Sequence, residues 1–420
     1  MRRRGYLALV AIAMTACTDS AMTPTAPRAN AAIADIGTAS AALDRYVAMG
    51  TSISMGWASD GVVAASQYDS WPAQLSRLAG RALDQPYISG TGCRAPMAAP
   101  LASGVRISGE SVLLSPALVQ CAPLLPGIDL PARNVAMSTA TTFEALYVTP
   151  ETRNDPFYSR LYPLVHPPNT TQLHAALANR PAFASVEFGA NEVLGVRDGR
   201  AIVGVTLYPV SAWSFLYSAL SDTVRMKVGR GVLVGLIKDI ETFPAFRRGD
   251  ELWGDRAAFF RTFNVEIKRD CRGSSNLIVV PFRVPSAVAA GLTARARGLP
   301  AVEFSCAAGP PTMVDYVLDP NEVAIVNAQL AQMNLIIRQT ADRVRFAHFQ
   351  LEALYGMSVL KPPFSVVALM TTAAPYSPYI SLDGFHPSGL GQGVLANAAA
   401  SAINRRYGFG LPVTSVVASR

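Results

Sequence analysis

The sequence predicts an α/β fold, a three-layer α/β/α sandwich in which a central parallel sheet lies between two layers of helices. The chain has 420 residues and half of them are hydrophobic, which is enough to bury a substantial core. Short apolar runs alternate along it with longer amphipathic segments. Such alternation is typical of a parallel sheet covered by helices on both faces.

The first strand and helix are predicted close to the start of the folded region, near Leu43. Residues 46–49 form a short apolar run that ends at Gly50, as buried strands often do. Residues 71–83 carry leucines at helical spacing and therefore predict an amphipathic helix.

Helices and strands continue to alternate through the rest of the chain. Helices are predicted at residues 171–179, 211–228, 320–341 and 388–407, and strands at residues 183–188, 231–240, 276–281 and 343–349. Insertions that contain Pro and Gly separate these units, at about 97–133, 147–168, 242–270 and 284–318. Because functional loops are often of this kind, the insertions are candidates for the rim of a substrate site.

The amino terminus predicts export. Three arginines at positions 2–4 precede an apolar stretch over residues 6–16 that is too short to span a bilayer, so residues 1–16 are typical of a secretory signal peptide. The end of this stretch resembles a lipobox, which predicts lipidation of Cys17; the alternative is a plain secreted protein. Residues 17–42 are small and polar and predict a flexible tether.

These features predict a lipoprotein on the outer membrane or the periplasmic face, or otherwise a periplasmic or secreted protein. Removal of residues 1–16 lowers the formal charge from +7 to +4, and the remaining basic residues are scattered, which argues against a nucleic-acid partner. Two uncharged runs, at residues 201–220 and 362–382, contain prolines and predict loops, strands or a lid rather than membrane spans.

Four cysteines remain after Cys17, and an even number in an exported chain suggests disulfides. Nearness in the sequence favours Cys93 with Cys121 and Cys271 with Cys306, and the alternative is four buried thiols. The Cys and His spacings do not suggest a metal site.

Asp383 and His386 form the strongest catalytic signal. The carboxylate precedes the imidazole by three residues, in a turn that opens the last predicted helix. A carboxylate that fixes the tautomer of a histidine allows it to act as a general base near neutral pH. The other histidines, His166, His174 and His348, lack a comparable neighbour and are interpreted as structural or surface residues.

Polar residues that directly follow predicted strands are candidates for the rest of the site, since ligands of parallel sheets bind beyond the carboxyl ends of the strands. Ser52 follows the first strand and lies between two glycines, Gly50 and Gly56. The segment 134–140 and the run 189–192 (Gly-Ala-Asn-Glu) are the other two positions.

With these motifs in this order, residues 43–408 resemble the SGNH, or GDSL-type, hydrolases. The resemblance implies a flavodoxin-like hydrolase domain over residues 43–410 with a tail at 411–420, and esterase or lipase activity on small-molecule or lipid esters with neither metal nor organic cofactor. By position, it implies that Ser52 is the nucleophile, His386 the general base and Asp383 its orienting residue. The implied oxyanion hole consists of the backbone N–H groups of Ser52 and Thr139 and the side-chain amide of Asn191.

The sequence departs from the family pattern at three positions. Thr51 replaces the usual Asp before the serine, Thr139 stands where a glycine is usual, and Glu192 replaces the Asp after the asparagine. Two alternatives therefore stay open beside the esterase or lipase: a carbohydrate deacetylase, and a catalytically inactive binding lipoprotein on the same fold.

Overall fold

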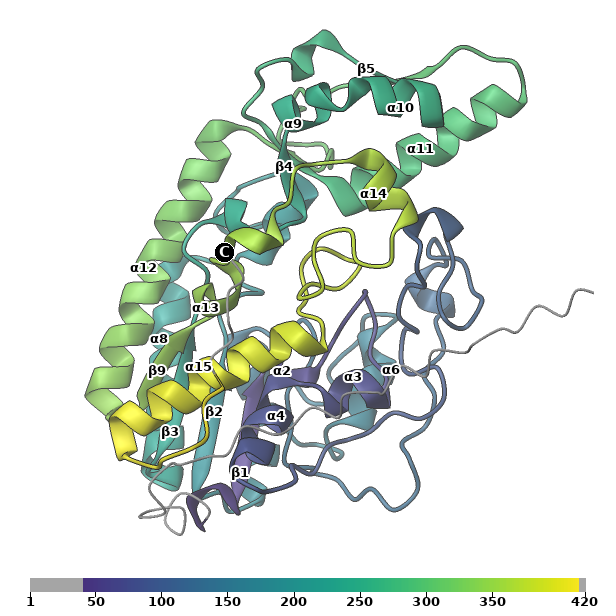
Figure 1. The fold of residues 1–420 in the computed structure, drawn as a ribbon. Helices are drawn as coiled ribbons and strands as arrows, with labels where there is room; N and C mark the ends of the chain where they lie inside the picture. Colours follow the sequence, from purple (N-terminus) through teal and green to yellow (C-terminus); the bar gives the residue numbers. More distant parts are fainter. Residues whose placement is uncertain (1–40, 415–420) are drawn as a thin grey trace, which may run out of the picture. The chain divides into compact units, whose positions relative to one another are not determined.

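A four-stranded parallel sheet lies at the centre of the computed structural model, which describes residues 41–414 (Figure 1). The strand order is β1 (Tyr46–Gly50), β2 (Phe183–Glu187), β3 (Gly231–Gly235) and β9 (Ala347–Gln350). The first three strands are buried along their whole length, as expected of a sheet covered on both faces. The predicted α/β class is confirmed.

The free edge of β1 carries a fifth, irregular segment. Asn134 forms a parallel bridge with Ala48, and the peptide N–H of Met137 donates to the carbonyl of Gly50 at 3.0 Å. This pairing brings the predicted segment 134–140 beside the end of β1, as the resemblance implies.

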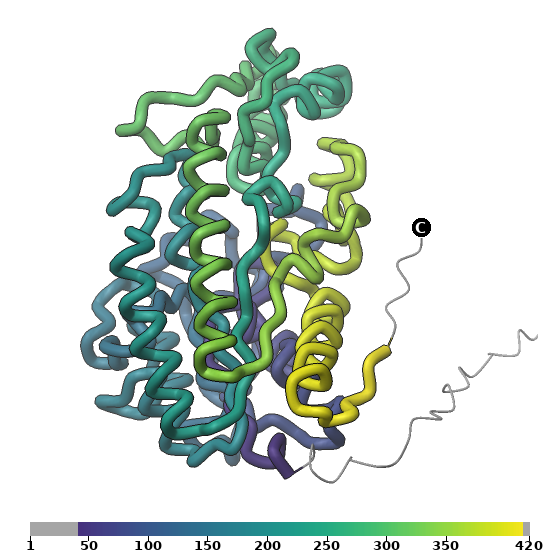
Figure 2. The backbone as a smooth tube through the Cα atoms, turned by 90° about the vertical axis from the view of Figure 1, so that its left-hand side faces the viewer, coloured from purple at the N-terminus to yellow at the C-terminus, as the bar shows by residue number. Residues whose placement is uncertain are grey.

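Helices form a layer on each side of the sheet. On one side, α15 (Gly389–Tyr407) packs against β9 and α4 (Trp71–Leu78). On the other side, α7 (Gln172–Ala178) packs on β1, α8 (Val210–Val228) on β2 and α12 (Pro320–Val344) on β3. Figure 2 shows α8 and α12 side by side, with α15 beyond the sheet.

The boundaries of several predicted elements needed correction. The helix predicted at 71–83 ends at Leu78, because Gly80 turns the chain with φ +70° and Leu83 instead packs into the core from a loop. The strand predicted at 343–349 begins only at Ala347, since α12 continues to Val344 and Arg345 closes it in the left-handed conformation. The strand predicted at 231–240 ends at Gly235.

The prediction for residues 276–281 was right about the strand and wrong about its sheet. β6 (Leu277–Val279) lies in a separate antiparallel sheet between β4 (Phe246–Arg248) and β8 (Val317–Leu318). The insertions around it also contain helices that the sequence analysis missed, α10 (Arg256–Phe263) and α11 (Val280–Ala296). Two prolines in α11 concealed its helical pattern.

The remaining regular elements are short. They are α3 (Ala64–Tyr68), α5 (Thr142–Tyr147), α6 (Tyr158–Leu161), α9 (Gly249–Gly254), α13 (Glu352–Tyr355) and α14 (Val366–Thr371), with the two-stranded sheet of β5 (Val265–Ile267) and β7 (Val302–Phe304).

Disulfides join Cys93 to Cys121 and Cys271 to Cys306, the pairs that nearness in the sequence favoured. None of the helices within residues 41–414 combines the length and the apolar character that a bilayer span requires. The predicted signal peptide, Cys17 and nearly all of the predicted tether lie outside the described residues.

Candidate active site

The predicted site residues come from four segments that meet at the carboxyl edge of the parallel sheet. Ser52 is the first residue of α2 (Ser52–Met55), directly after β1. Asn191 follows β2, Thr139 follows the segment beside β1, and His386 lies in the turn before α15. All four residues line one cavity.

His386 connects Ser52 to Asp383 through two hydrogen bonds. Its Nε2 lies 2.9 Å from Ser52 Oγ, and its Nδ1 lies 2.8 Å from Asp383 Oδ2. An ionised carboxylate can only accept hydrogen bonds, so Nδ1 carries the hydrogen that faces Asp383. The lone pair of Nε2 therefore faces the hydroxyl of Ser52, which is the orientation that a base needs to take its proton.

Asp383 is buried and stays ionised. Its Oδ1 accepts from the peptide N–H groups of Phe385 and His386, both at 2.9 Å, and its Oδ2 also accepts from the N–H of Asp60 at 2.8 Å. Burial by itself raises the pKa of a carboxyl group, but the adjacent His386 and these donors outweigh it and lower the pKa of Asp383 to about 2. The orienting charge is thus present throughout the neutral range.

The turn with Asp383 and His386 is held against the segment that follows α2. The N–H of Ser59 donates to Ser381 Oγ at 2.8 Å, and the N–H of Leu382 donates to Ser59 Oγ at 3.2 Å. These contacts join residues more than 300 positions apart. They fix the distance between the base and the serine.

Gly384 permits this turn. Its φ is +73°, and a Cβ there would lie 2.8 Å from the ring of Tyr376 and 3.0 Å from Ala245 Cβ. Any larger residue would be strained and crowded at this position.

Two peptide N–H groups and one amide form a set of donors on the cavity. Within residues 41–414, the N–H groups of Ser52 and Thr139 have no hydrogen-bond acceptor. Buried N–H groups without a partner are rare and often serve a ligand. The amide of Asn191 donates one hydrogen to the carbonyl of Ala140 at 2.9 Å, which fixes its orientation and leaves its second hydrogen available.

Thr139 adopts a backbone conformation that favours glycine, with φ +63°. The hydroxyl of Thr139 donates to the carbonyl of Ser138 at 2.7 Å. A β-branched residue is unusual in this region, so Thr139 holds the turn under local strain.

Glu187 was not found by the sequence analysis. It ends β2 opposite Gly50, and it accepts from the N–H and hydroxyl of Thr51, each at 2.9 Å, and from the hydroxyl of Ser54 at 3.0 Å. The start of α2 is therefore anchored on a buried carboxyl group, and Thr51 supplies two of the contacts. The signal that could have revealed it is an acidic residue inside an otherwise apolar strand.

Gly50 is required by this arrangement. A Cβ at Gly50 would lie 2.7 Å from Ser54 Oγ and 2.8 Å from Glu187 Oε2. A side chain between the first strand and the carboxyl group would displace Ser52.

We expect Glu187→Gln to change how stability depends on pH. Burial raises the pKa of Glu187 to about 7, although Thr51 and Ser54 oppose the shift. Because this pKa lies above the unfolded value, the native state favours the protonated form; its contribution is complete below about pH 4.5 and is lost as the pH rises through about 7. Urea unfolding at several pH values should show wild type losing up to about 3 kcal/mol relative to the variant over this range.

The control for this experiment is Glu266→Gln, the one exposed residue of β5. It should follow the wild-type pH dependence. The same pH dependence in Glu187→Gln and wild type would contradict the assigned titration.

Glu192 has a structural contact of its own. Its Oε1 accepts from the N–H of Thr142, at the first turn of α5, at 2.6 Å. Its pKa is raised by burial, which the bond to Thr142 opposes. The Glu after Asn191 thus positions α5, whose N-cap lies beside the Thr139 segment.

The three histidines other than His386 lie outside the candidate site. His166 is buried and its Nε2 lies 2.9 Å from the carbonyl of Val135; burial lowers its pKa to about 4. Burial also lowers the pKa of His348, on β9. His174 lies on α7.

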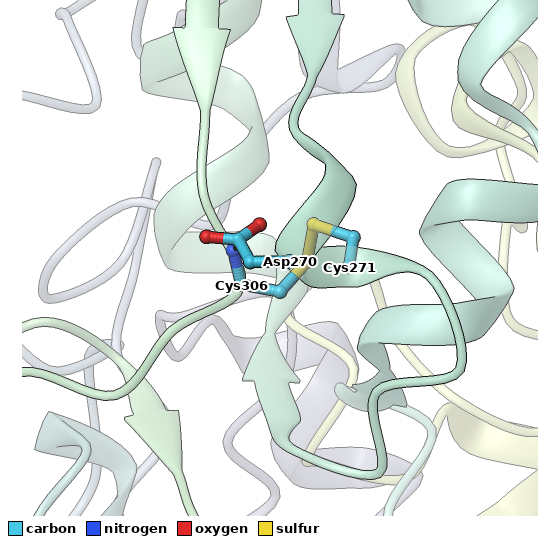
Figure 3. Close-up of side chains that lie close together, drawn as sticks. All are labelled: Asp270, Cys271 and Cys306. Atoms are coloured by element: carbon cyan, nitrogen blue, oxygen red, sulfur yellow. Dashed lines mark hydrogen bonds between the residues drawn. A yellow bond between two sulfur atoms is a disulfide. The ribbon is translucent and has the colours of Figure 1, made fainter.

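One group within residues 41–414 has the residue types of a metal site, namely Asp270, Cys271 and Cys306. Figure 3 shows that the two sulfur atoms form a disulfide beside the carboxylate. Asp270 accepts from the N–H of Cys306 at 3.2 Å and from the hydroxyl of Ser305. Disulfide sulfurs are not thiolate ligands, so the cluster holds the loop together.

No family model matches the chain, and no curated protein sequence does. Among solved structures, an acetylxylan esterase from Geobacillus stearothermophilus shares 12% identity over 88% of this chain and 96% of its own, with a TM-score of 0.35. An extracellular lipase from Streptomyces rimosus shares 12% identity over 84% of this chain and 98% of its own, with a TM-score of 0.33. Likenesses this remote carry no argument about function.

Proposed function

We propose that the protein is a serine hydrolase that cleaves carboxylic esters through an acyl-enzyme on Ser52. The observation that carries the proposal is the unbroken hydrogen-bonded path from Ser52 Oγ through His386 to the ionised Asp383. The unpartnered donors on the same cavity support it, because a serine and a base alone do not stabilise the oxyanion of acyl transfer.

The reaction follows from these positions. Ser52 Oγ attacks the ester carbonyl while His386 Nε2 takes its proton, and the oxyanion forms against the N–H groups of Ser52 and Thr139 and the amide of Asn191. His386 then gives the proton to the leaving alcohol. A water molecule repeats the sequence on the acyl-enzyme and releases the acid, so His386 and Ser52 return to their starting states.

A fluorophosphonate probe tests the proposal directly. We expect covalent labelling of the folded protein at a single residue, Ser52. The Ser52→Ala variant should not be labelled. The absence of labelling in folded wild-type protein would favour the alternative of an inactive binding protein on this fold.

We expect Asn191→Ala to lower kcat by roughly 10²–10³, the usual cost of one oxyanion donor. KM should change little, because the donor acts on charge that develops only in the transition state. Initial rates on a small chromogenic ester measure both parameters. Asn179→Ala, which removes an amide that bonds to the carbonyls of Ala132 and Ala175 away from the cavity, is the matched control; an equal loss in both variants would contradict the oxyanion role.

A further inference from the structure

Two cavities of opposite character meet at Ser52 and His386. Both are lined by Ser52, Asn191, Leu194 and His386, so a group bonded to Ser52 borders each of them. A scissile ester placed at the serine would therefore extend one part into each cavity. The size and polarity of each cavity therefore indicate which half of the ester it binds.

The first cavity is a narrow apolar slot. Apart from residues at the reacting centre, it is lined by aliphatic and aromatic side chains that follow β3 and β9 and the catalytic turn, including Leu236, Ile240, Phe243 and Phe385. It offers about 40 Å³ to the centres of water-sized groups. The second cavity offers about 240 Å³ by the same measure, so the slot is much the smaller of the two and accepts a short acyl chain.

The second cavity is larger and polar. It offers about 240 Å³ by the same measure, and Arg94, Arg197 and Tyr158 are among the residues that line it. Tyr158 is partly buried, and burial raises its pKa, so it remains a neutral hydrogen-bond donor. The aromatic side chains of Trp57 and Phe282 complete these walls.

Positive charge is in excess around this second cavity. Asp60 is shared by two arginines, since its Oδ2 lies 2.9 Å from Arg94 and 2.8 Å from the buried Arg106. Asp198, the other carboxylate on the walls of this cavity, forms an ion pair with Arg200 at 3.7 Å.

Arg197 has no carboxylate within ion-pair distance among the described residues. Its guanidinium lies over the ring of Phe282, 6.0 Å from the ring centre. Four guanidinium groups thus face three carboxylates in and just behind the walls, the third being Asp383 behind His386. Beyond them, Arg283 and Asp315 lie close enough to interact and offset one another.

We propose that the substrate is an ester between a short acyl group and an anionic, hydroxyl-bearing alcohol that Arg197 and Arg94 recognise. This proposal rests on the ester hydrolysis proposed above. The acyl group occupies the slot and the alcohol occupies the polar cavity. Arg197 supplies the charge for the anionic group, and Tyr158 is placed to bond a hydroxyl.

The direction of the substrate follows from the chemistry of the leaving group. The alcohol must take a proton from His386 and depart into water, whereas the acyl group stays on Ser52 until a water molecule releases it. A polar cavity solvates a departing alcohol, and an apolar slot retains a short alkyl chain. The bond to Ser52 Oγ forms first, and the C–O bond to the alcohol breaks when the tetrahedral intermediate collapses and His386 protonates the alcohol.

The length of the acyl group is tested with 4-nitrophenyl esters of acetate, butyrate, octanoate and palmitate. We expect kcat/KM to be highest for acetate or butyrate and to fall by at least about tenfold at octanoate, because a longer chain has no room in the slot. Leu236→Ala should move the optimum to a longer chain. A maximum at octanoate or palmitate in wild type would overturn the assignment of the slot.

The charge of the alcohol is tested with three acetylated sugars that carry the acetyl group on the same hydroxyl: methyl glucoside, methyl glucuronide and glucose 6-phosphate. We expect kcat/KM, measured by release of acetate, to be about tenfold higher for the two anionic sugars. Added salt should reduce this ratio, because it screens exposed charges. If only one of the two anionic sugars is preferred, its anionic group, carboxylate or phosphate, is the one that the cavity recognises.

Arg197→Gln should reduce the ratio of anionic to neutral turnover by about tenfold, and Arg197→Lys should restore part of it. Arg405→Gln, an exposed arginine in the last turn of α15, is the matched control and should leave the ratio unchanged. An equal rate on all three sugars in wild type, or an unchanged ratio in Arg197→Gln, would overturn the anion assignment. Neither outcome affects labelling of Ser52 by fluorophosphonate, so failure of this proposal and failure of ester hydrolysis are separable.

Discussion

Ser52→Ala and His386→Ala should each lower kcat on a small chromogenic ester by about 10⁴–10⁶. Without the Ser52 hydroxyl no acyl-enzyme forms, and without His386 nothing within reach takes its proton, since Nε2 is the group 2.9 Å from Oγ. The two losses should not add in the double variant, because the serine and the base act as one unit. Stopped-flow or steady-state rates measure the effect.

Ser214→Ala is the matched control for Ser52→Ala. The hydroxyl of Ser214 bonds only to the carbonyl of Ser211 on α8, so its removal should leave turnover unchanged. Thermal unfolding of all variants confirms that they fold. Wild-type turnover in folded Ser52→Ala would exclude the mechanism, and Ser54 would not replace it, because its hydroxyl bonds to Glu187 and to the indole N–H of Trp71.

Asp383→Asn should lower kcat by roughly 10³–10⁴ with little change in KM. The asparagine oxygen fits at Oδ1, where it accepts from the N–H groups of Phe385 and His386. Its NH₂ group then faces Nδ1 of His386 and the N–H of Asp60, where Oδ2 accepts in the wild type. A donor facing Nδ1 favours the tautomer that has its hydrogen on Nε2, and that tautomer cannot act as a base toward Ser52.

The same substitution should destabilise the fold, because the N–H of Asp60 loses its acceptor. Two measurements separate these effects. Loss of the tautomer lowers kcat at every pH in a pH–rate profile. Partial unfolding also lowers the concentration of active sites, which titration with fluorophosphonate measures. Full kcat in folded Asp383→Asn would contradict the role of the carboxylate. Asp222→Asn, on the surface of α8, is the control.

The strands of the central sheet and the candidate site residues were predictable, because each of these residues directly follows a local pattern in the sequence. Ser52 lies between glycines after an apolar run, and Asp383 and His386 share one turn. Glu187 was not predictable, because its role depends on the register that pairs it with Gly50, and pairing between residues 137 positions apart leaves no local pattern. The sheet of β6 was misassigned for a related reason, since a three-residue apolar strand looks the same in a parallel and an antiparallel sheet.

The cavities could not be predicted, because their walls come from distant segments. Arg94 follows Cys93 just before the insertion at 97–133, Tyr158 lies in the insertion at 147–168, and Arg197 follows β2 by ten positions. None of the three has a neighbour in the sequence that indicates a ligand. Their common position appears only when the insertions fold over the edge of the sheet.

Ser59 and Asp60 contact the turn at residues 381–383. The site can therefore form only after this turn has been synthesised. Ser52, the proposed nucleophile, is made early in synthesis, and His386, its proposed base, is made near the end. Domains fold from the amino terminus as the chain emerges, yet here the base can reach the serine only after almost the whole chain has been made. A nascent chain therefore holds an unactivated serine hydroxyl, and a truncated product that ends before the final turn remains inert toward esters around it.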